Sequence, residues 1–369
     1  MNKLKKIIIF YPNTERGGVI NNLINISNYL SIYFEVYLIT DLKKKNKFNR
    51  NIRFVLFRSI NRIFNIYYKF FSTLKASFVL FSFLRKHDPK NTIVFSAQSH
   101  VVAILISKIL NFKIVIRNSE DIIASTIFSE NYFKSFFVFV SKFFFYNFAT
   151  KIITNSKKSL NSLKKIIFFK KKLVLIYNPY LSKIYKNNKK NKKKNIILNI
   201  GRFCKQKNQI QLINAFERFH NLYSDFKLFL VGGGYNEKVI RQFIKNKNLQ
   251  KKIYLKKWSK NLSKYYLESK FFVLSSLYEG LPNCLLDSVN YELPVVSTAV
   301  AGAEDILIKN RGGYLAKVNN EDSLLLAMIE CQKKYVNSQN KILYAKIFLK
   351  RFLINNQSKK YLNLIKKSV

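Results

Sequence analysis

Acidic residues are scarce in this chain of 369 residues, which has 19 Asp and Glu against 66 Lys and Arg. The net charge of +47 favours an anionic partner, either nucleic acid or an anionic membrane surface, and charge alone does not choose between them. Drift of exposed positions to lysine in an AT-rich genome explains the same bias equally well. Both explanations of the charge stay open at this point.

Cysteine is also rare. The three cysteines, Cys204, Cys284 and Cys331, are odd in number and have neither metal-ligand spacing nor the spacing of a disulfide framework. We therefore expect no metal site built on cysteine, and a protein of the reducing cytoplasm.

No apolar run is long enough to span a bilayer. The longest tracts, residues 76–84 and 135–150, fall short of the ~20 residues that a spanning helix needs, and Lys142 interrupts the second. Both tracts place Phe and Tyr beside Lys and Arg, which fits either an interfacial element or a buried core. The apolar run at residues 7–10 is too short for a signal peptide and predicts a first β-strand.

The chain alternates short apolar runs with helical patterns, as βα units do. Its length predicts two domains. We expect α/β domains at residues 1–180 and 195–345, joined by the lysine-rich segment 183–194, and a C-terminal helix over 346–369 that packs back on the first domain. Strands are predicted at residues 6–11, 34–40, 52–57, 92–96, 113–116, 151–154, 173–176, 195–200, 227–231, 253–255, 271–275 and 294–297.

Two motifs follow predicted strands of the second domain. Arg202 and Lys207 flank a loop between one strand and the next helix, where open α/β sheets bind ligands and where two cations can neutralise a diphosphate. The next strand ends in three glycines around Gly233, which let the backbone approach a nucleotide or simply turn the chain.

The most informative segment is residues 273–288, which runs from a strand into a helix. The strand delivers Glu279 to a turn at Gly280, and Pro282 suits the first turn of a helix. Asp287 then lies roughly 7.5 Å along that helix. Free amides at the helix start favour a phosphate, and the two carboxylates suit sugar and ribose hydroxyls. The segment predicts a clamp for a nucleotide sugar.

In the order and spacing of these motifs the sequence resembles the retaining glycosyltransferases of family 4. The resemblance covers roughly residues 5–355 and is stronger in the second domain. It implies the GT-B fold, in which two Rossmann-like domains face one another across a cleft. The first domain would then bind the acceptor and the second the nucleotide-sugar donor.

The resemblance also implies roles for individual residues. Arg202 and Lys207 would contact the donor diphosphate, and Glu279 the donor sugar. Asp287 stands where the family usually has a second glutamate, which makes a ribose contact less direct. The remaining donor-binding candidates are the glycine loop and the backbone around the helix start: Gly17, Gly18, Gly233, Gly280, Leu281, Pro282 and Asn283.

The first domain departs from the family pattern. Many relatives carry a histidine after the fourth strand of this domain, whereas this chain has Arg117 and Asn118 there. His100 follows a different predicted strand and either faces the cleft or caps a helix. We take these three residues as candidates for the acceptor side.

The sequence has no Asp-x-Asp motif, so a metal-bound diphosphate has no evident ligands. We expect no metal and no cofactor, with the nucleotide sugar as co-substrate. The predicted reaction moves a hexose or N-acetylhexosamine from a UDP-sugar to a lipid-linked saccharide or a lipopolysaccharide or capsule acceptor. Two alternatives stay open, a basic nucleic-acid-binding protein and an inactive sugar-nucleotide binder with the same fold.

The basic, aromatic first domain suits an anionic membrane face. We therefore expect an anionic membrane surface as a partner and no nucleic acid. The expected location is the cytoplasm, peripheral on the cytoplasmic face of the inner membrane.

Overall fold

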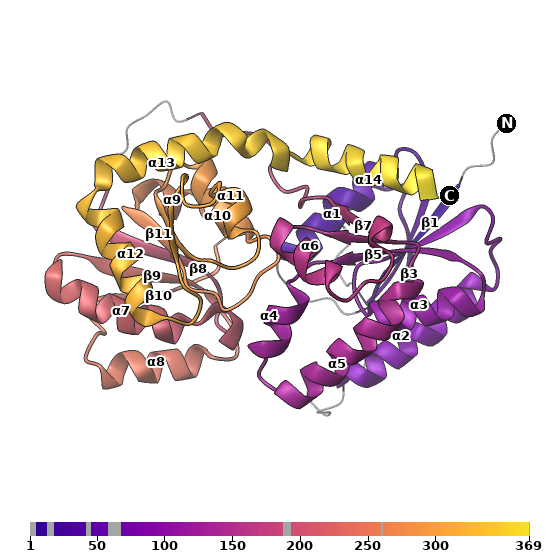
Figure 1. The fold of residues 1–369 in the computed structure, drawn as a ribbon, viewed down its shortest axis with the longest axis horizontal. Helices are drawn as coiled ribbons and strands as arrows, with labels where there is room; N and C mark the ends of the chain where they lie inside the picture. The colour runs from indigo at the N-terminus through magenta and orange to yellow at the C-terminus, as the bar shows by residue number, and fades with distance from the viewer. Residues whose placement is uncertain are drawn as a thin grey trace. The chain divides into compact units, whose positions relative to one another are not determined.

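The computed structural model describes residues 5–12, 18–41, 46–57, 68–186, 193–259 and 261–368. The chain forms two compact units (Figure 1). Unit 1 comprises Met1–Ser119, Phe136–Ser182 and Phe352–Val369, and unit 2 comprises Glu120–Ser135 and Lys183–Arg351. The division therefore assigns a short stretch of the first half to unit 2, and it separates the C-terminal helix from unit 2 at Phe352.

Unit 1 contains a seven-stranded sheet in the order β3-β2-β1-β4-β5-β6-β7, in which every paired strand is parallel. The strands are β1 Lys6–Tyr11, β2 Glu35–Thr40, β3 Arg53–Leu56, β4 Thr92–Ser96, β5 Lys113–Asn118, β6 Lys151–Thr154 and β7 Leu173–Leu175. The helices with residues in unit 1 are α1 Gly18–Leu30, α2 Tyr68–Leu84, α3 His100–Ile109, α5 Tyr132–Phe145, α6 Lys157–Lys164 and α14 Ile354–Ser368, with short 3-10 turns η1 Tyr146–Phe148 and η2 Lys170–Lys172.

The centre of unit 1 is β1, where Ile7, Ile8 and Ile9 are fully buried. A continuous run of apolar residues is what a central parallel strand requires, because helices cover both of its faces. The C-terminal helix α14 joins this core through Tyr361 and Ile365 and lies against α1 (Figure 1).

Unit 2 contains a six-stranded parallel sheet in the order β10-β9-β8-β11-β12-β13. The strands are β8 Ile196–Arg202, β9 Lys227–Gly233, β10 Ile253–Lys257, β11 Phe271–Leu274, β12 Val295–Thr298 and β13 Tyr314–Ala316. The helices are α4 Ile122–Ile127, α7 Gln209–Leu222, α8 Glu237–Asn246, α9 Ser263–Glu268, α10 Asn283–Asn290, α11 Ala303–Ile306, α12 Glu321–Lys333 and α13 Tyr335–Ile347, with 3-10 turns η3 Lys205–Lys207 and η4 Phe348–Phe352 at the end of the unit.

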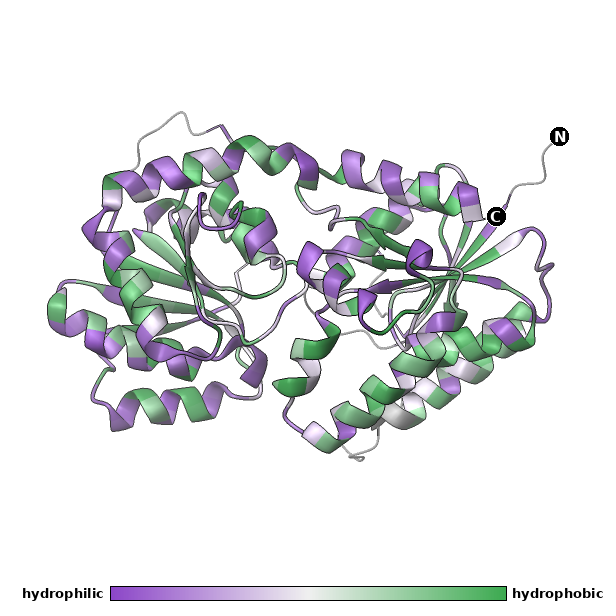
Figure 2. Ribbon diagram, in the orientation of Figure 1, coloured by the Kyte–Doolittle hydropathy of each residue, from purple (hydrophilic) through white to green (hydrophobic). Residues whose placement is uncertain are grey.

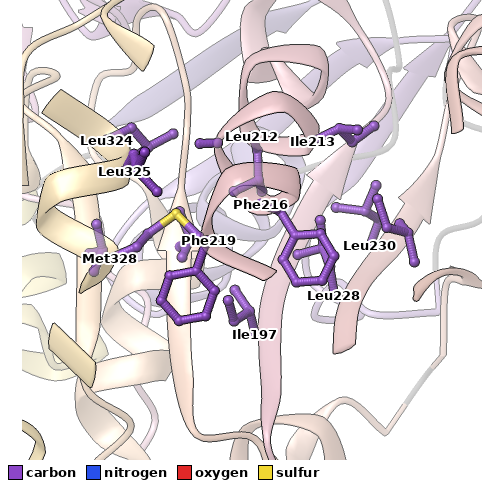
Figure 3. Packing of buried hydrophobic residues seen from close by; sticks show 14 of the residues in the cluster. Ile197, Leu212, Ile213, Phe216, Phe219, Leu228, Leu230, Leu324, Leu325 and Met328 are labelled. Atoms are coloured by element: carbon purple, nitrogen blue, oxygen red, sulfur yellow. The ribbon is translucent and has the colours of Figure 1, made fainter. Parts of the chain in front are cut away.

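The main core of unit 2 packs α7 and α12 against the sheet. Phe216 and Phe219 of α7 are fully buried beside Ile197 of β8 and Met328 of α12 (Figure 3). Each Phe that leaves water contributes on the order of 1.5–3 kcal/mol. This core fixes β8 in the middle of the sheet, and β8 ends at Arg202, just before the turn that carries Lys207.

Twelve strands lie at the twelve predicted positions, with ends that differ by a few residues at most. The strand β13, of three residues, is not among those predicted. Within the described residues, no helix combines the length and the apolar character needed to cross a membrane.

Gly232 and Gly233, the last two residues of β9, differ in how much room each leaves for a side chain. A Cβ on Gly232 would lie 1.9 Å from the carbonyl oxygen of Gly201, its register partner in β8. A Cβ on Gly233 would meet nothing closer than 3.8 Å, at the Glu237 carboxylate. Gly232 is therefore required for the close approach of β8 and β9, whereas Gly233 is not.

We predict that Gly232→Ala destabilises the protein by about 1–3 kcal/mol, the usual cost of forcing atoms into a packed interior. Gly233→Ala is the matched control and should unfold like the wild type. Urea unfolding followed by circular dichroism measures both. Equal losses in the two variants would show that the approach of β8 to β9 is not the constraint.

Candidate active site

The candidate site lies where the strand order of unit 2 changes direction. From β8 the chain moves outward to β9 and β10, and then returns to the other side of β8 to form β11. In open parallel sheets such a point opens a crevice at the carboxyl ends of the two central strands, and ligands bind there. The loops that follow β8 and β11 carry the predicted donor-site residues.

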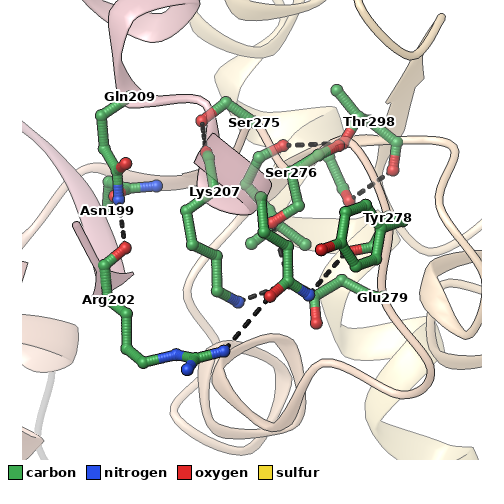
Figure 4. A network of polar contacts seen from close by, with 12 residues as sticks. Asn199, Arg202, Lys207, Gln209, Ser275, Ser276, Tyr278, Glu279 and Thr298 are labelled. Carbon is green, nitrogen blue, oxygen red and sulfur yellow. Dashed lines mark hydrogen bonds and ion pairs between the residues drawn. The ribbon is translucent and has the colours of Figure 1, made fainter. Parts of the chain in front are cut away.

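Lys207 and Glu279 form an ion pair between these two loops (Figure 4). The Lys207 ammonium donates to Glu279 Oε1, and the two side chains are only 14% and 11% exposed. The Ser276 hydroxyl donates to the same carboxylate oxygen at 2.8 Å. A carboxylate this deeply buried needs such partners, because an unpaired buried charge is very costly.

The pKa of Lys207 reflects the same pairing. Burial, the largest single cause, lowers the pKa of its ammonium, but the charge and hydrogen bond of Glu279, together with Cys284 and Cys204, raise the pKa above the usual 10.5. Burial also raises the pKa of the neighbouring Cys284 thiol to about 12. At neutral pH the site therefore holds a charged lysine and a neutral thiol.

Arg202 lies at the end of β8, with its side chain exposed to solvent. Its Nη2 is 3.3 Å from the side-chain oxygen of Gln206, and the Gln206 amide donates to the Tyr278 carbonyl at 2.9 Å. The Leu277 amide in turn donates to the Gln206 carbonyl at 2.8 Å. Gln206 therefore ties the loop that carries Arg202 and Lys207 to the loop that carries Glu279.

Further polar side chains hold the two loops in place. Ser275 Oγ donates to the Lys207 carbonyl at 2.8 Å, and Thr298 Oγ1 donates to the Ser276 carbonyl at 2.7 Å (Figure 4). Asn199 Nδ2, inside β8, donates to the Val273 carbonyl of β11 at 2.8 Å. The sequence analysis missed these residues and Gln206. Asn199 and Thr298 could have been found as polar side chains within otherwise apolar buried strands, whereas Gln206 lies in the turn η3 and has no such signal.

The turn from Gly280 to the start of α10 packs against a second glycine. Helix α10 begins at Asn283, and Pro282 is its N-cap residue. Gly302 has a φ of 78°, and a Cβ there would lie 2.3 Å from the Gly280 carbonyl oxygen and 2.7 Å from the Leu281 Cα. Gly302, which was also missed, therefore fixes this turn. Pro282 has no amide hydrogen, so it can shape the helix start but cannot donate to a ligand.

Asp287 lies in the second turn of α10 and is half-buried. Its carbonyl accepts the Tyr291 amide at 2.9 Å. Burial, and after it the Asp287 charge, raises the pKa of the Tyr291 hydroxyl. The proposed contact of Asp287 with the donor ribose stays a prediction.

The glycine loop of the first domain is described only in part. Gly17 lies outside the described residues, and Gly18 is the exposed first residue of α1. A Cβ added at Gly233 would make only an ordinary contact, 3.8 Å from a Glu237 carboxylate oxygen, so the backbone there is not crowded. Room for a ligand at Gly233 fits the predicted role, which stays a prediction.

The acceptor-side candidates lie in unit 1. His100 is the first residue of α3, and its Nδ1 lies 2.9 Å from Ser96 Oγ. Burial, followed by the charges of Lys142 and Arg117, lowers the pKa of His100 to about 3. Its imidazole is therefore neutral at physiological pH. An acceptor role of His100 stays a prediction.

Arg117 is 1% exposed, and Asn118 is buried beside it in β5. The Arg117 guanidinium donates to Tyr361 of α14 at 2.9 Å, to Asn178 at 2.7 Å and to Ser119 at 2.5 Å. These contacts give Arg117 a structural role, because they join β5 to the C-terminal helix. An acceptor contact by either residue stays a prediction.

Comparison with known proteins agrees with this geometry. Residues 182–346, which include β8, β11 and both loops of the site, match the family described as glycosyl transferases group 1. Residues 182–346 are therefore similar to group 1 glycosyltransferase domains. Among the residues that the structure describes, no group of three or more His, Cys, Asp or Glu side chains could hold a metal ion.

Two relatives illustrate the range of similarity of this chain. An uncharacterized glycosyltransferase of Methanocaldococcus jannaschii is 31% identical over 64% of this chain and 62% of its own length. The N-acetylgalactosamine-N,N'-diacetylbacillosaminyl-diphospho-undecaprenol 4-alpha-N-acetylgalactosaminyltransferase of Campylobacter jejuni is 32% identical over 59% of this chain and 61% of its own length. The matches thus span less than two thirds of either relative.

Solved structures show the same fold over the whole chain. The crystal structure of HepE from Anabaena in complex with UDP and glucose has a TM-score of 0.78, covers 98% of this chain and 100% of its own, and is 15% identical. The expected fold class, two Rossmann-like α/β domains of the GT-B type, is confirmed.

We predict that Lys207→Met destabilises the protein by about 3–5 kcal/mol, because it leaves the Glu279 carboxylate buried and unpaired. Lys207→Met/Glu279→Leu should recover most of the loss. Because the folded pKa of Lys207 lies above 10.5, the contribution of the pair is complete below pH 10.5 and declines as the pH rises through the folded pKa. Urea unfolding across pH measures this. A double variant no more stable than the single one would contradict the pairing.

Proposed function

We propose that the protein is a retaining glycosyltransferase that moves a hexose or N-acetylhexosamine from a UDP-sugar to a hydroxyl of a lipid-linked saccharide. The observation that carries the proposal is the Lys207–Glu279 pair at the point where the sheet of unit 2 changes direction. It combines a cation for a diphosphate with a carboxylate for sugar hydroxyls. The group 1 glycosyltransferase match over residues 182–346 supports the same reaction class.

The Lys207–Glu279 pair can bind both parts of a nucleotide sugar, the diphosphate and the sugar. The Lys207 ammonium has three N–H donors, and Glu279 accepts one of them. The other two can be directed to the diphosphate, while the Glu279 carboxylate accepts from sugar hydroxyls. The exposed Arg202 guanidinium is free of burial costs and can pair with a second phosphate oxygen.

In the proposed reaction an acceptor hydroxyl oxygen bonds to the anomeric carbon as the bond from that carbon to the UDP oxygen breaks. The hydroxyl proton is released with UDP, and the products are the glycosylated acceptor and UDP. Negative charge grows on the departing diphosphate, where the Arg202 and Lys207 side chains stabilise it. Such preorganised electrostatic stabilisation is usually the largest single contribution to catalysis.

The acceptor class is proposed from the relatives. The Campylobacter jejuni relative is named for transfer to a saccharide carried on diphospho-undecaprenol. We propose the same kind of acceptor here, with a lipopolysaccharide or capsule precursor as the product. The location that goes with it is the cytoplasmic face of the inner membrane.

We predict that Arg202→Ala and Glu279→Ala each lower kcat about 100-fold or more, in line with the loss of one preorganised charge-stabilising group. The matched control for Arg202 is Arg241→Ala, which removes an exposed arginine paired with Glu237 on α8 and should leave turnover unchanged. Transfer from radiolabelled UDP-sugars to a short-chain lipid diphosphate saccharide measures all three.

Thermal shift with UDP checks that each variant remains folded and reports donor binding. Unchanged turnover in both site variants would reject the site. Salt-sensitive binding of DNA by a protein that ignores every UDP-sugar would instead favour a nucleic-acid-binding function.

We also propose that transfer needs no metal ion. Arg202 and Lys207 supply positive charge at the site, so chelation with EDTA should leave kcat unchanged, and added Mg²⁺ or Mn²⁺ should not raise it. Turnover is measured on protein dialysed against EDTA. A loss of about tenfold or more that Mn²⁺ restores would contradict the proposal, since a metal bridging the diphosphate supplies several kcal/mol.

A further inference from the structure

An unusual set of phenylalanine side chains lies on the surface of unit 1. Phe137 and Phe144 of α5 are 71% and 59% exposed, and Phe148, just after α5, is 54% exposed. The two consecutive residues Phe168 and Phe169, in the turn before β7, are 67% and 66% exposed. We call these five residues the aromatic ridge. None of the residues of α5 is buried, although most of them are hydrophobic (Figure 2).

The ridge is a built feature of the fold. Asn147 is 9% exposed and joins the end of α5 to the turn: its side-chain oxygen accepts the Phe168 amide at 2.9 Å, and its side-chain nitrogen donates to the Phe143 carbonyl at 2.8 Å. Lys172 donates to the Asn147 carbonyl at 2.6 Å, and the Phe143 and Phe168 rings lie 5.7 Å apart. The rings of Phe168 and Phe169 are therefore held at the surface by a buried polar clamp.

The charge around the ridge has one sign only. Residues 136–182 contain nine lysines and neither Asp nor Glu. The exposed Lys164 and Lys165 precede the Phe pair, and the exposed Lys170 and Lys171 follow it. Burial, followed by the charges of Lys108 and Lys151, lowers the pKa of Lys172, which reflects the local excess of positive charge.

From this arrangement we infer that the aromatic ridge and its flanking lysines bind the surface of an anionic lipid bilayer. Phenylalanine has no hydrogen-bonding group, and its transfer from water into the boundary of the acyl chains is favourable, while lysines beside it pair with anionic headgroups. The biological purpose of this membrane binding rests on the proposed function, because a lipid-linked acceptor lies in such a bilayer. The binding itself is tested without any substrate.

The ring geometry favours lipid over single-stranded nucleic acid. The Phe143 ring packs edge to face on Phe144 and on Phe168, at interplanar angles of 88° and 81°. Bases stack on aligned, open ring faces, and this packing offers no row of them. Insertion into an apolar layer makes no such demand on ring orientation.

The test compares binding of the full-length protein to vesicles of phosphatidylcholine with and without phosphatidylglycerol, by co-sedimentation. We expect binding only with phosphatidylglycerol, and a decrease in Phe168→Ser/Phe169→Ser of about tenfold or more. The control Leu222→Ser/Val336→Ser removes two exposed apolar side chains of unit 2 and should bind like the wild type. Circular dichroism verifies that both variants are folded.

A second pair of variants tests the charge. Lys170→Gln/Lys171→Gln should weaken vesicle binding about 30-fold, at about 1 kcal/mol per lysine near the surface. Lys238→Gln/Lys245→Gln on α8 removes the same charge elsewhere and should have little effect. Equal binding by all variants, or equal loss in ridge and control variants, would overturn the inference. The inference would also be overturned if the ridge variant bound vesicles as the wild type does but bound a single-stranded oligonucleotide more weakly.

Activity separates this inference from the proposed function. Phe168→Ser/Phe169→Ser should transfer sugar normally to a short-chain, water-soluble acceptor and poorly to the same saccharide on a long-chain lipid in vesicles. A wild type that transfers nothing to either acceptor rejects the proposed function, and the vesicle measurements still decide the inference.

Discussion

The ion pair between Lys207 and Glu279 is the constraint on which the candidate site depends. Two opposite charges lie in a largely buried crevice, and each is tolerable there only because the other is present. The pair also links two loops that are 72 residues apart in the sequence. Any movement of one loop relative to the other would expose an unpaired charge, so the pair fixes the spacing of the residues proposed to bind the diphosphate and the sugar.

The sheet of unit 2 makes this pairing possible. Because β8 and β11 are adjacent and parallel, their carboxyl ends lie at one edge, and the loop after each strand begins at that edge. Asn199 and Thr298 then use buried hydrogen bonds to fix the loops relative to the strands. The Asn199 amide nitrogen is satisfied by its bond, whereas its buried side-chain oxygen has no partner among the described residues. The fold thus brings the two loops close together, and the polar side chains fix the position of one loop relative to the other.

Much of this fold follows from the sequence in physical terms. The apolar runs predict the strands well, because a central parallel strand is buried on both faces and therefore forms a continuous apolar run. The three-residue strand β13 was not predicted, although β7, which is equally short, was. The residues Arg202, Lys207 and Glu279 could be selected because each stands beside the end of a predicted strand.

The contacts between side chains could not be read in the same way. Lys207 is one of many lysines, and only the structure identifies it as the one that meets Glu279. Arg117 illustrates the opposite case: an arginine after a strand suggests a ligand contact, yet its three donor bonds to Tyr361, Asn178 and Ser119 lie within unit 1. Tyr361 and Asn178 come from distant parts of the chain, and local patterns hold no information about them.

The distribution of charge bears on the two explanations of the lysine excess. A uniform drift of exposed positions to lysine would spread the shortage of acids evenly along the chain. Instead, residues 131–216 contain no Asp or Glu at all, whereas acids recur through the rest of unit 2 from Glu217 onward. The acid-free stretch includes the turn where Phe168 and Phe169 are exposed. An AT-rich composition favours phenylalanine and lysine along the whole chain, so it does not account for the absence of acids from this one stretch, whereas a surface that meets anionic lipid accounts for the rings and the missing acids together.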